Sequence, residues 1–297
     1  MTVTAPHGSV PAIEPGSSRA VQRRRSRRWL VVRVALAAVV CLVMVFPLWV
    51  MVVTAFSGTA VFSQQLELWP QRFTLASFEK VFASWPVGTW FGNSVTVSVI
   101  TTVLSVIVSV TGGFAFAKLR FRGQTVMFMA LLATMMIPVQ ATLVPSFRIV
   151  NAMGLIGTFW AVIIPGAAAT FGVFLSRQFM LAIPTELLEA ARIDGAGEIR
   201  IFHSVGLNVL TPALVTVFLF QLVGIWNNYF LPLVMLSDQR LYPITLGLVN
   251  WRSQTDRLPE FYQLTTAGVL LSVIPLAIAM IVLQRFWRGG LTEGSVK

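Results

Sequence analysis

Long stretches without a charged side chain recur along this chain of 297 residues. The first runs from Val34 to Phe56, and about 23 residues are enough for a helix to cross the hydrocarbon core of a bilayer. Repeated apolar runs of this length indicate transmembrane helices. We therefore predict an all-α, polytopic integral membrane protein with six transmembrane helices, which lie within residues 34–56, 81–117, 124–147, 151–176, 204–237 and 261–284.

The composition excludes several other classes of protein. Charged residues make up 11% of the chain, whereas a soluble domain carries roughly 25%. A cytosolic enzyme, a secreted disulfide scaffold and a disordered chain are therefore excluded. The single cysteine, Cys41, lies inside an apolar run, and the two histidines, His7 and His203, are far apart in the sequence. We accordingly expect neither a disulfide nor a metal site.

Basic residues set the expected orientation in the membrane. A cluster of arginines at 23–25 and 27–28 precedes the first apolar stretch. If this cluster is cytoplasmic, most of the 22 Lys and Arg residues fall on the cytoplasmic side, as the positive-inside rule requires, and both termini are cytoplasmic. The net charge of +11 is then a topology signal at anionic lipid headgroups. No aromatic residues are interleaved with the arginines, so we expect no nucleic-acid partner.

The same pattern divides the chain into segments. The predicted segments are a disordered basic cytoplasmic tail (1–28), a first transmembrane helix (29–56), an extracytoplasmic loop (57–87), a core domain of five helices (88–286) that includes a cytoplasmic loop (177–206), and a cytoplasmic tail (287–297). Tryptophans occur in both long extracytoplasmic loops. They fit either anchoring at the membrane interface or contact with an extracytoplasmic partner.

The predicted cytoplasmic loop is unusually acidic for this chain. Residues 177–203 hold four of its eleven acidic side chains. The run Pro184-Thr185-Glu186 is typical of a helix start with Thr185 as the cap, and Gly195 can supply the left-handed residue that ends a helix. We therefore predict a short helix of about two to three turns, followed by a second one.

The loop also carries a motif. Glu189-Ala190-Ala191 is followed by Asp194-Gly195-Ala196 and then by Phe202, Val205, Leu207 and Pro212. This pattern resembles the EAA loop of ABC importer permeases, and the resemblance covers about residues 88–285. The family usually has a Leu-Pro pair where this chain has Leu207-Asn208.

The resemblance implies the fold of a type I ABC importer permease and a role for the loop. In the family, the loop is the coupling helix, which sits in a groove of a cytoplasmic ATPase and passes nucleotide-driven closure to the membrane helices. By position, Glu189 would pair with a basic residue of the ATPase, Ala190 and Ala191 would pack in the ATPase groove, and Gly195 would form the turn. Asp194 is the remaining residue of the predicted coupling site. The alternative is an amphipathic helix that lies on the lipid headgroups. The acidic residues of the loop disfavour this alternative, because the headgroups of the leaflet are anionic.

The resemblance also implies partners. They are a second homologous permease subunit, cytoplasmic ATP-binding subunits and an extracytoplasmic substrate-binding protein, assembled in the cell membrane of a prokaryote. The chain contains no Gly-x-x-x-x-Gly-Lys-Ser/Thr phosphate loop. We therefore expect it to bind no cofactor, while the partner ATPase uses ATP and Mg.

A second, less specific resemblance concerns the substrate. Residues 226–233 resemble the sugar-importing branch of the family, the relatives of the maltose-transporter permease. The candidate substrate path consists of Gln221, Trp226, Asn227 and Asn228. Amides can pair with the hydroxyls of a sugar or related polyol, and an indole can lie against its ring. Hydrogen bonding between helices is the alternative role for these residues.

Two other classes of function are weighed against an importer subunit. A self-sufficient secondary transporter or channel would need titratable or ion-coordinating residues near the membrane midplane, and the predicted spans contain none that is clearly buried. A membrane-embedded enzyme would need a catalytic constellation, and the sequence displays none. We therefore predict a transporter subunit that is not an enzyme.

Overall fold

The computed structural model describes residues 16–57, 68–70, 72–207, 211–253 and 260–292. Within this part of the chain the regular secondary structure is helical, apart from an isolated bridge between Ser57 and Phe73. The α-helices are α1 (Gly16–Phe56), α2 (Ala76–Ser84), α3 (Val87–Lys118), α4 (Gln124–Thr134), α5 (Val139–Ala152), α6 (Trp160–Ala167), α7 (Thr170–Leu181), α8 (Thr185–Ile193), α9 (Glu198–Ile201), α11 (Thr211–Trp226), α12 (Phe230–Met235), α13 (Ile244–Ser253) and α14 (Glu260–Thr292). A π-helix, η1 (Phe202–Gly206), and a 3-10 helix, η2 (Gln239–Leu241), complete the set.

The apolar stretches form helices, although not six equal ones. The segments long and apolar enough to cross a membrane are Trp29–Phe56, Val87–Lys118, Trp160–Leu181 and Phe261–Phe286. The bent pair of α4 and α5 adds a fifth if it is counted as one span, and the apolar part of α11, Leu214–Trp226, is shorter. The prediction of an all-α polytopic membrane protein is confirmed, with six as an approximate count of its spans.

Three of the predicted stretches are interrupted, and the fifth, 204–237, is divided between α11 and α12. α4 and α5 are bent by 104° instead of forming one helix across 124–147. Pro138 precedes α5 with an extended ψ of 134°, and proline both lacks an amide hydrogen and disfavours a helical residue before it. The fourth stretch consists of α6 and α7, which are separated by the non-helical Ala168 and Ala169. An uncharged stretch therefore predicts an apolar segment, but it does not predict that the segment is one straight helix.

The outermost helices extend beyond their predicted limits. α1 begins at Gly16, within the predicted disordered tail, and α14 continues to Thr292, within the predicted C-terminal tail. Residues 16–28 are helical where disorder was predicted, because a nucleated helix propagates readily through good helix formers such as arginine. No disorder was predicted for the C-terminal tail. The rest of the predicted tails, residues 1–15 and 293–297, and part of the first loop lie outside the described residues.

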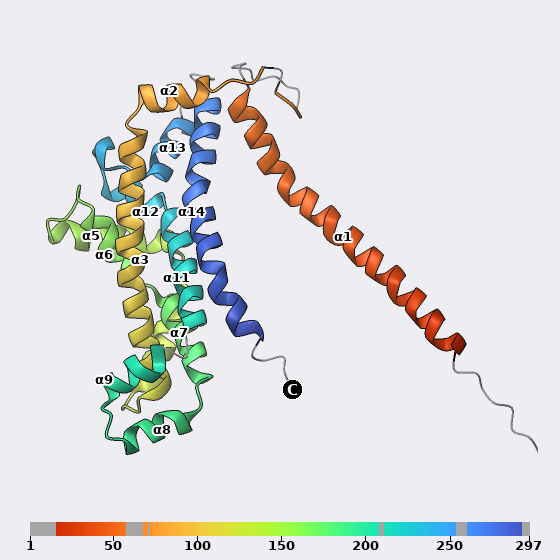
Figure 1. Ribbon diagram of the computed structural model, residues 1–297. Coiled ribbons are helices and arrows are strands. Elements are labelled where there is room, and N and C mark those ends of the chain that lie inside the picture. Colours follow the sequence, from red (N-terminus) through yellow and green to blue (C-terminus); the bar gives the residue numbers. More distant parts are fainter. Residues whose placement is uncertain (1–15, 58–67, 71, 208–210, 254–259, 293–297) are drawn as a thin grey trace, which may run out of the picture.

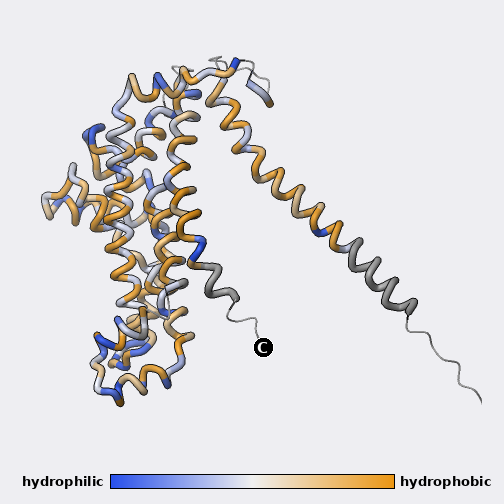
Figure 2. Tube along the Cα trace, viewed as in Figure 1, coloured by the Kyte–Doolittle hydropathy of each residue, from blue (hydrophilic) through white to orange (hydrophobic). Residues whose placement is uncertain are grey.

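The helices form an elongated bundle with different elements at its two ends. α3 runs along the bundle, α2 and α13 lie at one end, α8 and α9 lie at the other, and α1 leans away (Figure 1). Apolar residues cover the long helices, whereas hydrophilic residues gather around α8 and α9 (Figure 2). The predicted cytoplasmic loop and the predicted extracytoplasmic segments are thus at opposite ends.

Close helix packing centres on α3, which lies against α7 and α11. Gly113 abuts Ser176, and Gly172 abuts Ser109. Such small residues let membrane helices approach closely. The buried side of α3 is rich in hydroxyl groups, which belong to Ser94, Ser98, Thr101, Thr102, Ser105 and Ser109.

Apolar clusters consolidate the two ends of the bundle. At the α2 and α13 end, Trp90 and Trp251 are fully buried and pack together at a centroid distance of 5.5 Å. Trp90 Nε1 also donates to the Gln239 carbonyl at 2.7 Å. At the other end lies what we call the α8 cluster, formed by Val110, Phe114, Met180, Ile183, Leu188 and Ile201.

Candidate functional site

The acidic loop forms the short helix that its sequence predicts. α8 spans Thr185–Ile193 and is followed by Gly195 with a φ of +78°, a left-handed conformation that glycine adopts without strain. The Gly195 amide donates to the Arg192 carbonyl and the Ala196 amide to the Ala191 carbonyl, both at 3.0 Å. The helix and its glycine stop are therefore confirmed, as is the second helix, α9.

The start of α8 differs from the prediction in one detail. Pro184 occupies the cap position, Thr185 is the first helical residue, and no side chain caps the helix. The cap prediction was wrong because Pro184, with a ψ of 135°, already turns the chain into the helix. Asn208, where the motif departs from the family, lies outside the described residues.

The two faces of α8 meet different surroundings. Leu188 is 2% exposed inside the α8 cluster, and Ala191 is half buried against the same cluster. Residues three to four positions apart share one side of a helix. The opposite side, with Glu186, Glu189, Ala190 and Ile193, is exposed, and Ile193 is 85% accessible. Of the two alanines of the motif, only Ala190 therefore presents its methyl group to a potential partner.

An ion pair joins α8 to α9. Arg192 Nε lies 2.8 Å from Glu198 Oε1, and the hydrogen bond to Glu198 raises the pKa of the Arg192 guanidinium. Both groups are exposed, so the pair contributes little to stability. It helps set the direction in which α9 leaves the turn at Asp194 and Gly195, both of which are exposed.

An open groove of about 860 Å³ runs beside α8. One side is formed by α8 and α9, and the other by the end of α3 and the turn that follows it. The charged and polar lining residues are Lys118, Arg120, Gln124, Thr185, Glu189, Arg192 and Glu198. The groove is thus suited to a polar partner surface with both charge signs.

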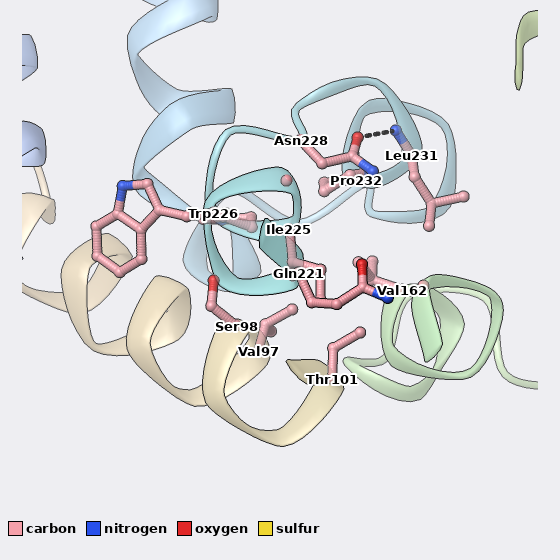
Figure 3. A pocket seen from close by; sticks show the side chains of 13 residues that line it. Val97, Ser98, Thr101, Val162, Gln221, Ile225, Trp226, Asn228, Leu231 and Pro232 are labelled. Atoms are coloured by element: carbon pink, nitrogen blue, oxygen red, sulfur yellow. Dashed lines mark hydrogen bonds between the residues drawn. The ribbon is translucent and has the colours of Figure 1, made fainter. Parts of the chain in front are cut away.

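A smaller cavity of about 110 Å³ lies within the bundle. Gln221 from α11 lines it together with Ser98 and Thr101 from α3 and with Asn228 (Figure 3). Gln221 Nε2 and Thr101 Oγ1 are buried without a hydrogen-bond partner. The Asn228 side-chain oxygen accepts the Leu231 amide at 3.2 Å and the Phe230 amide at 3.1 Å, so this side chain satisfies the first two amide groups of α12.

Not all residues of the predicted substrate path point into this cavity. The Trp226 indole is directed away from it (Figure 3), is 4% exposed and packs on Phe91 at a centroid distance of 6.1 Å. Asn227 is exposed, and its Nδ2 donates to the Val223 carbonyl of α11, the helix that it follows. The structure therefore places Gln221, Asn228 and part of Trp226 at the cavity, with the Trp226 ring extending away from it, and Asn227 does not line the cavity.

Sequence reasoning missed the hydroxyl residues of the cavity, Ser98 and Thr101. The sequence could have identified them, because Ser and Thr recur three or four residues apart along α3. This spacing places them on one side of the helix. Among the described residues, no group of His, Cys, Asp or Glu could hold a metal ion.

Comparisons with known proteins agree with this arrangement. The profile of the family described as "Binding-protein-dependent transport system inner membrane component" matches residues 109–289, which include the α8 loop and the cavity residue Gln221. The arabinooligosaccharides transport system permease protein AraQ of Halalkalibacterium halodurans is 33% identical over 267 residues, 88% of this chain and 94% of that protein. The sn-glycerol-3-phosphate transport system permease protein UgpE of Brucella abortus is 32% identical over 204 residues, 68% of this chain and 71% of that protein.

Solved structures share the fold. A chain from the crystal structure of a bacterial ABC transporter involved in import of the acidic polysaccharide alginate superposes with a TM-score of 0.76 at 25% identity, covering 89% of this chain and 98% of that one. A chain of the MetNI methionine ABC transporter, at 18% identity and a TM-score of 0.53, supports the fold alone. The chain thus belongs to the binding-protein-dependent transport system inner membrane components, the multi-pass permease subunits of ABC importers.

Proposed function

We propose that this permease subunit serves the uptake of a carbohydrate or related polyol. The observation that carries the proposal is the cavity around Gln221, whose lining contains amide and hydroxyl groups and no charged side chain. A buried polar atom without a partner costs about 1–3 kcal/mol, which a ligand hydroxyl or a water molecule can recover. The names of the relatives, which include transporters of arabinooligosaccharides and glycerol phosphate, support the same substrate class.

The size of the cavity bears on how the substrate passes. A volume of about 110 Å³ accommodates a few water molecules, each of which occupies roughly 30 Å³ in the liquid, and is too small for an oligosaccharide. We infer that the path lies between this chain and a second, homologous permease. Gln221 and Asn228 would then contribute polar groups to one wall of that path.

The exposed face of α8 is the proposed contact with a cytoplasmic ATPase. Glu189 and Ala190 would meet the ATPase, while Asp194 and Gly195 shape the turn that presents them. The ATPase would use ATP and Mg, and this chain would contribute a conformational change without enzymatic activity. Both termini would then be cytoplasmic, and an extracytoplasmic binding protein would deliver substrate at the end that carries α2 and α13.

Reconstitution in liposomes tests this function. The chain alone should neither hydrolyse ATP nor take up labelled oligosaccharides or polyols. The complete set of two permeases, ATPase and binding protein should take up substrate only with ATP, and an ATPase without its phosphate-loop lysine is the control. Uptake by the isolated chain in response to an ion gradient would instead identify a secondary transporter.

A further inference from the structure

A lysine at the end of α3 is bonded to the residue that precedes α8. Lys118 Nζ donates to the Ile183 carbonyl at 2.7 Å, although the two residues are 65 positions apart. Hydrogen bonds from a charged donor are roughly twice as strong as neutral ones. Ile183 is followed by Pro184, the cap residue of α8, so this bond fixes the point at which the chain enters the helix.

The bond lies beside a well-packed part of the protein. Ile183 and Leu188 are 3% and 2% exposed, and both belong to the α8 cluster together with Phe114 of α3. Apolar packing is non-directional, so the cluster seats α8 without a directional contact at the start of the helix. A short charged hydrogen bond at the start of α8 adds the direction that packing lacks.

A second cation ties the neighbouring helices together. Arg177 of α7 donates from Nε to the Phe116 carbonyl of α3 at 3.1 Å, and its guanidinium lies 4.2 Å from the centre of the Phe128 ring of α4. Gln124 Nε2 donates to the same Phe116 carbonyl at 2.9 Å. α3, α4 and α7 are thus joined at the end where Lys118 holds the α8 loop.

We propose that Lys118 is a positioning residue that makes α8 move together with α3. The inference rests on the proposed coupling function of α8. A displacement that an ATPase imposes on α8 would pass through the bond between Lys118 and Ile183 to the end of α3. Because α3 also carries Ser98 and Thr101, the same displacement reaches the cavity. Lys118 does not line the cavity, but it lines the groove beside α8 together with Glu189. Retention of the ATPase by a Lys118 variant therefore separates positioning of α8 from direct contact with the ATPase.

The test uses the complete reconstituted complex with Lys118→Met, which keeps an extended apolar side chain and removes the donor. Arg122→Met is the matched control, because Arg122 is an exposed cation in the turn that follows α3. Lys118→Arg is the conservative variant. The readouts are ATPase subunits retained per permease, ATP hydrolysis with and without loaded binding protein, and substrate transported per ATP.

Lys118→Met should retain the ATPase and hydrolyse ATP, but transport several-fold less substrate per ATP and lose stimulation by the loaded binding protein. Lys118→Arg should restore most of the transport per ATP, and Arg122→Met should match the wild type. Three results would overturn the proposal: unchanged transport per ATP, an equal loss in Arg122→Met, or failure of the Lys118→Met complex to assemble. Failure of the proposed function is recognised separately, because the wild-type complex would then show no ATP-dependent uptake.

Discussion

Adjacent residues of the Glu-Ala-Ala motif serve different surfaces. Ala191 is half buried against the α8 cluster, whereas Ala190 and Glu189 are exposed. Each residue advances about 100° around a helix, so neighbours along the chain do not share a side. Ala191 therefore helps to seat α8 on its own subunit, and the other two residues remain free to meet a partner.

Reversing the charge of Glu189 tests this division. Glu189→Lys should change the free energy of unfolding by less than about 0.5 kcal/mol, because the side chain is exposed. Against a basic partner, the lost attraction and new repulsion should cost about 2–5 kcal/mol of association free energy and abolish ATP-dependent uptake. ATPase copurification and proteoliposome uptake measure the effect, and Glu79→Lys on α2, at the opposite end of the bundle, is the control for ATPase copurification. Normal values for both would show that α8 is not the coupling element.

The two amides at the cavity should respond in opposite ways to replacement. Gln221→Leu removes an unpartnered buried Nε2, so the free energy of unfolding should stay constant or rise by about 1 kcal/mol, while uptake falls. Asn228→Ala removes the acceptor of the first two α12 amides. This substitution should lower the free energy of unfolding by about 1 kcal/mol. Thermal unfolding of the purified complex and uptake assays separate these effects. Destabilisation by Gln221→Leu would mean that the amide already has a partner.

At the scale of elements, α3 connects the two ends of the molecule. Its cytoplasm-directed end, in the proposed orientation, carries Lys118, and its middle carries the cavity residues Ser98 and Thr101. Its close contact with α7 depends on glycine, since a methyl group at Gly113 would lie 2.5 Å from Ser176 Cβ and 2.8 Å from the Arg177 backbone nitrogen. A backbone atom cannot move aside as a side chain can, so the helices themselves would have to separate.

Two neighbouring glycines provide a matched pair for this contact. Gly113→Ala should lower the free energy of unfolding by about 1–3 kcal/mol, because it overpacks the interface of α3 with α7. Gly112→Ala should change it by less than about 1 kcal/mol, since its methyl group would lie 3.3 Å from the Val173 side chain and alanine favours a helix. Thermal unfolding in detergent provides the comparison. Equal effects for the two variants would refute the close contact at Gly113.

At the scale of the whole molecule, the α8 end and the α13 end lie at opposite ends of the bundle (Figure 1). The excess of basic residues beside the α8 loop predicts that this end is cytoplasmic. The orientation decides which end can meet an ATPase and which can meet a binding protein. The proposed coupling of α8 to an ATPase therefore depends on this orientation.

Cysteine labelling tests the orientation. With Cys41 replaced by alanine, Ser253→Cys on α13 should react with a membrane-impermeant thiol reagent in intact cells. Gly197→Cys, in the loop after α8, should react only after the membrane is opened. Both positions are exposed in the structure, so differences in labelling report the side of the membrane. Labelling of Gly197→Cys in intact cells would reverse the orientation and contradict coupling through α8.

Local sequence patterns were enough to predict the membrane class, the approximate helix limits and the local form of the α8 loop. These properties depend on neighbouring residues: an uncharged run predicts a membrane helix, and Gly195 ends α8 because the left-handed conformation is a local preference. The resemblance of the 189–196 motif added the family, which the comparisons confirm.

The side of each helix that contacts a given neighbour became known only from the packing of the helices in three dimensions. It buried Trp226 against Phe91, brought Thr101 of α3 to Gln221 of α11, and bonded Lys118 to Ile183. In a soluble helix, the apolar stripe reveals the buried side. Lipid is as apolar as a protein core, so a membrane helix lacks this contrast, and its contacts are selected by the fit of small residues and by hydrogen bonds between helices.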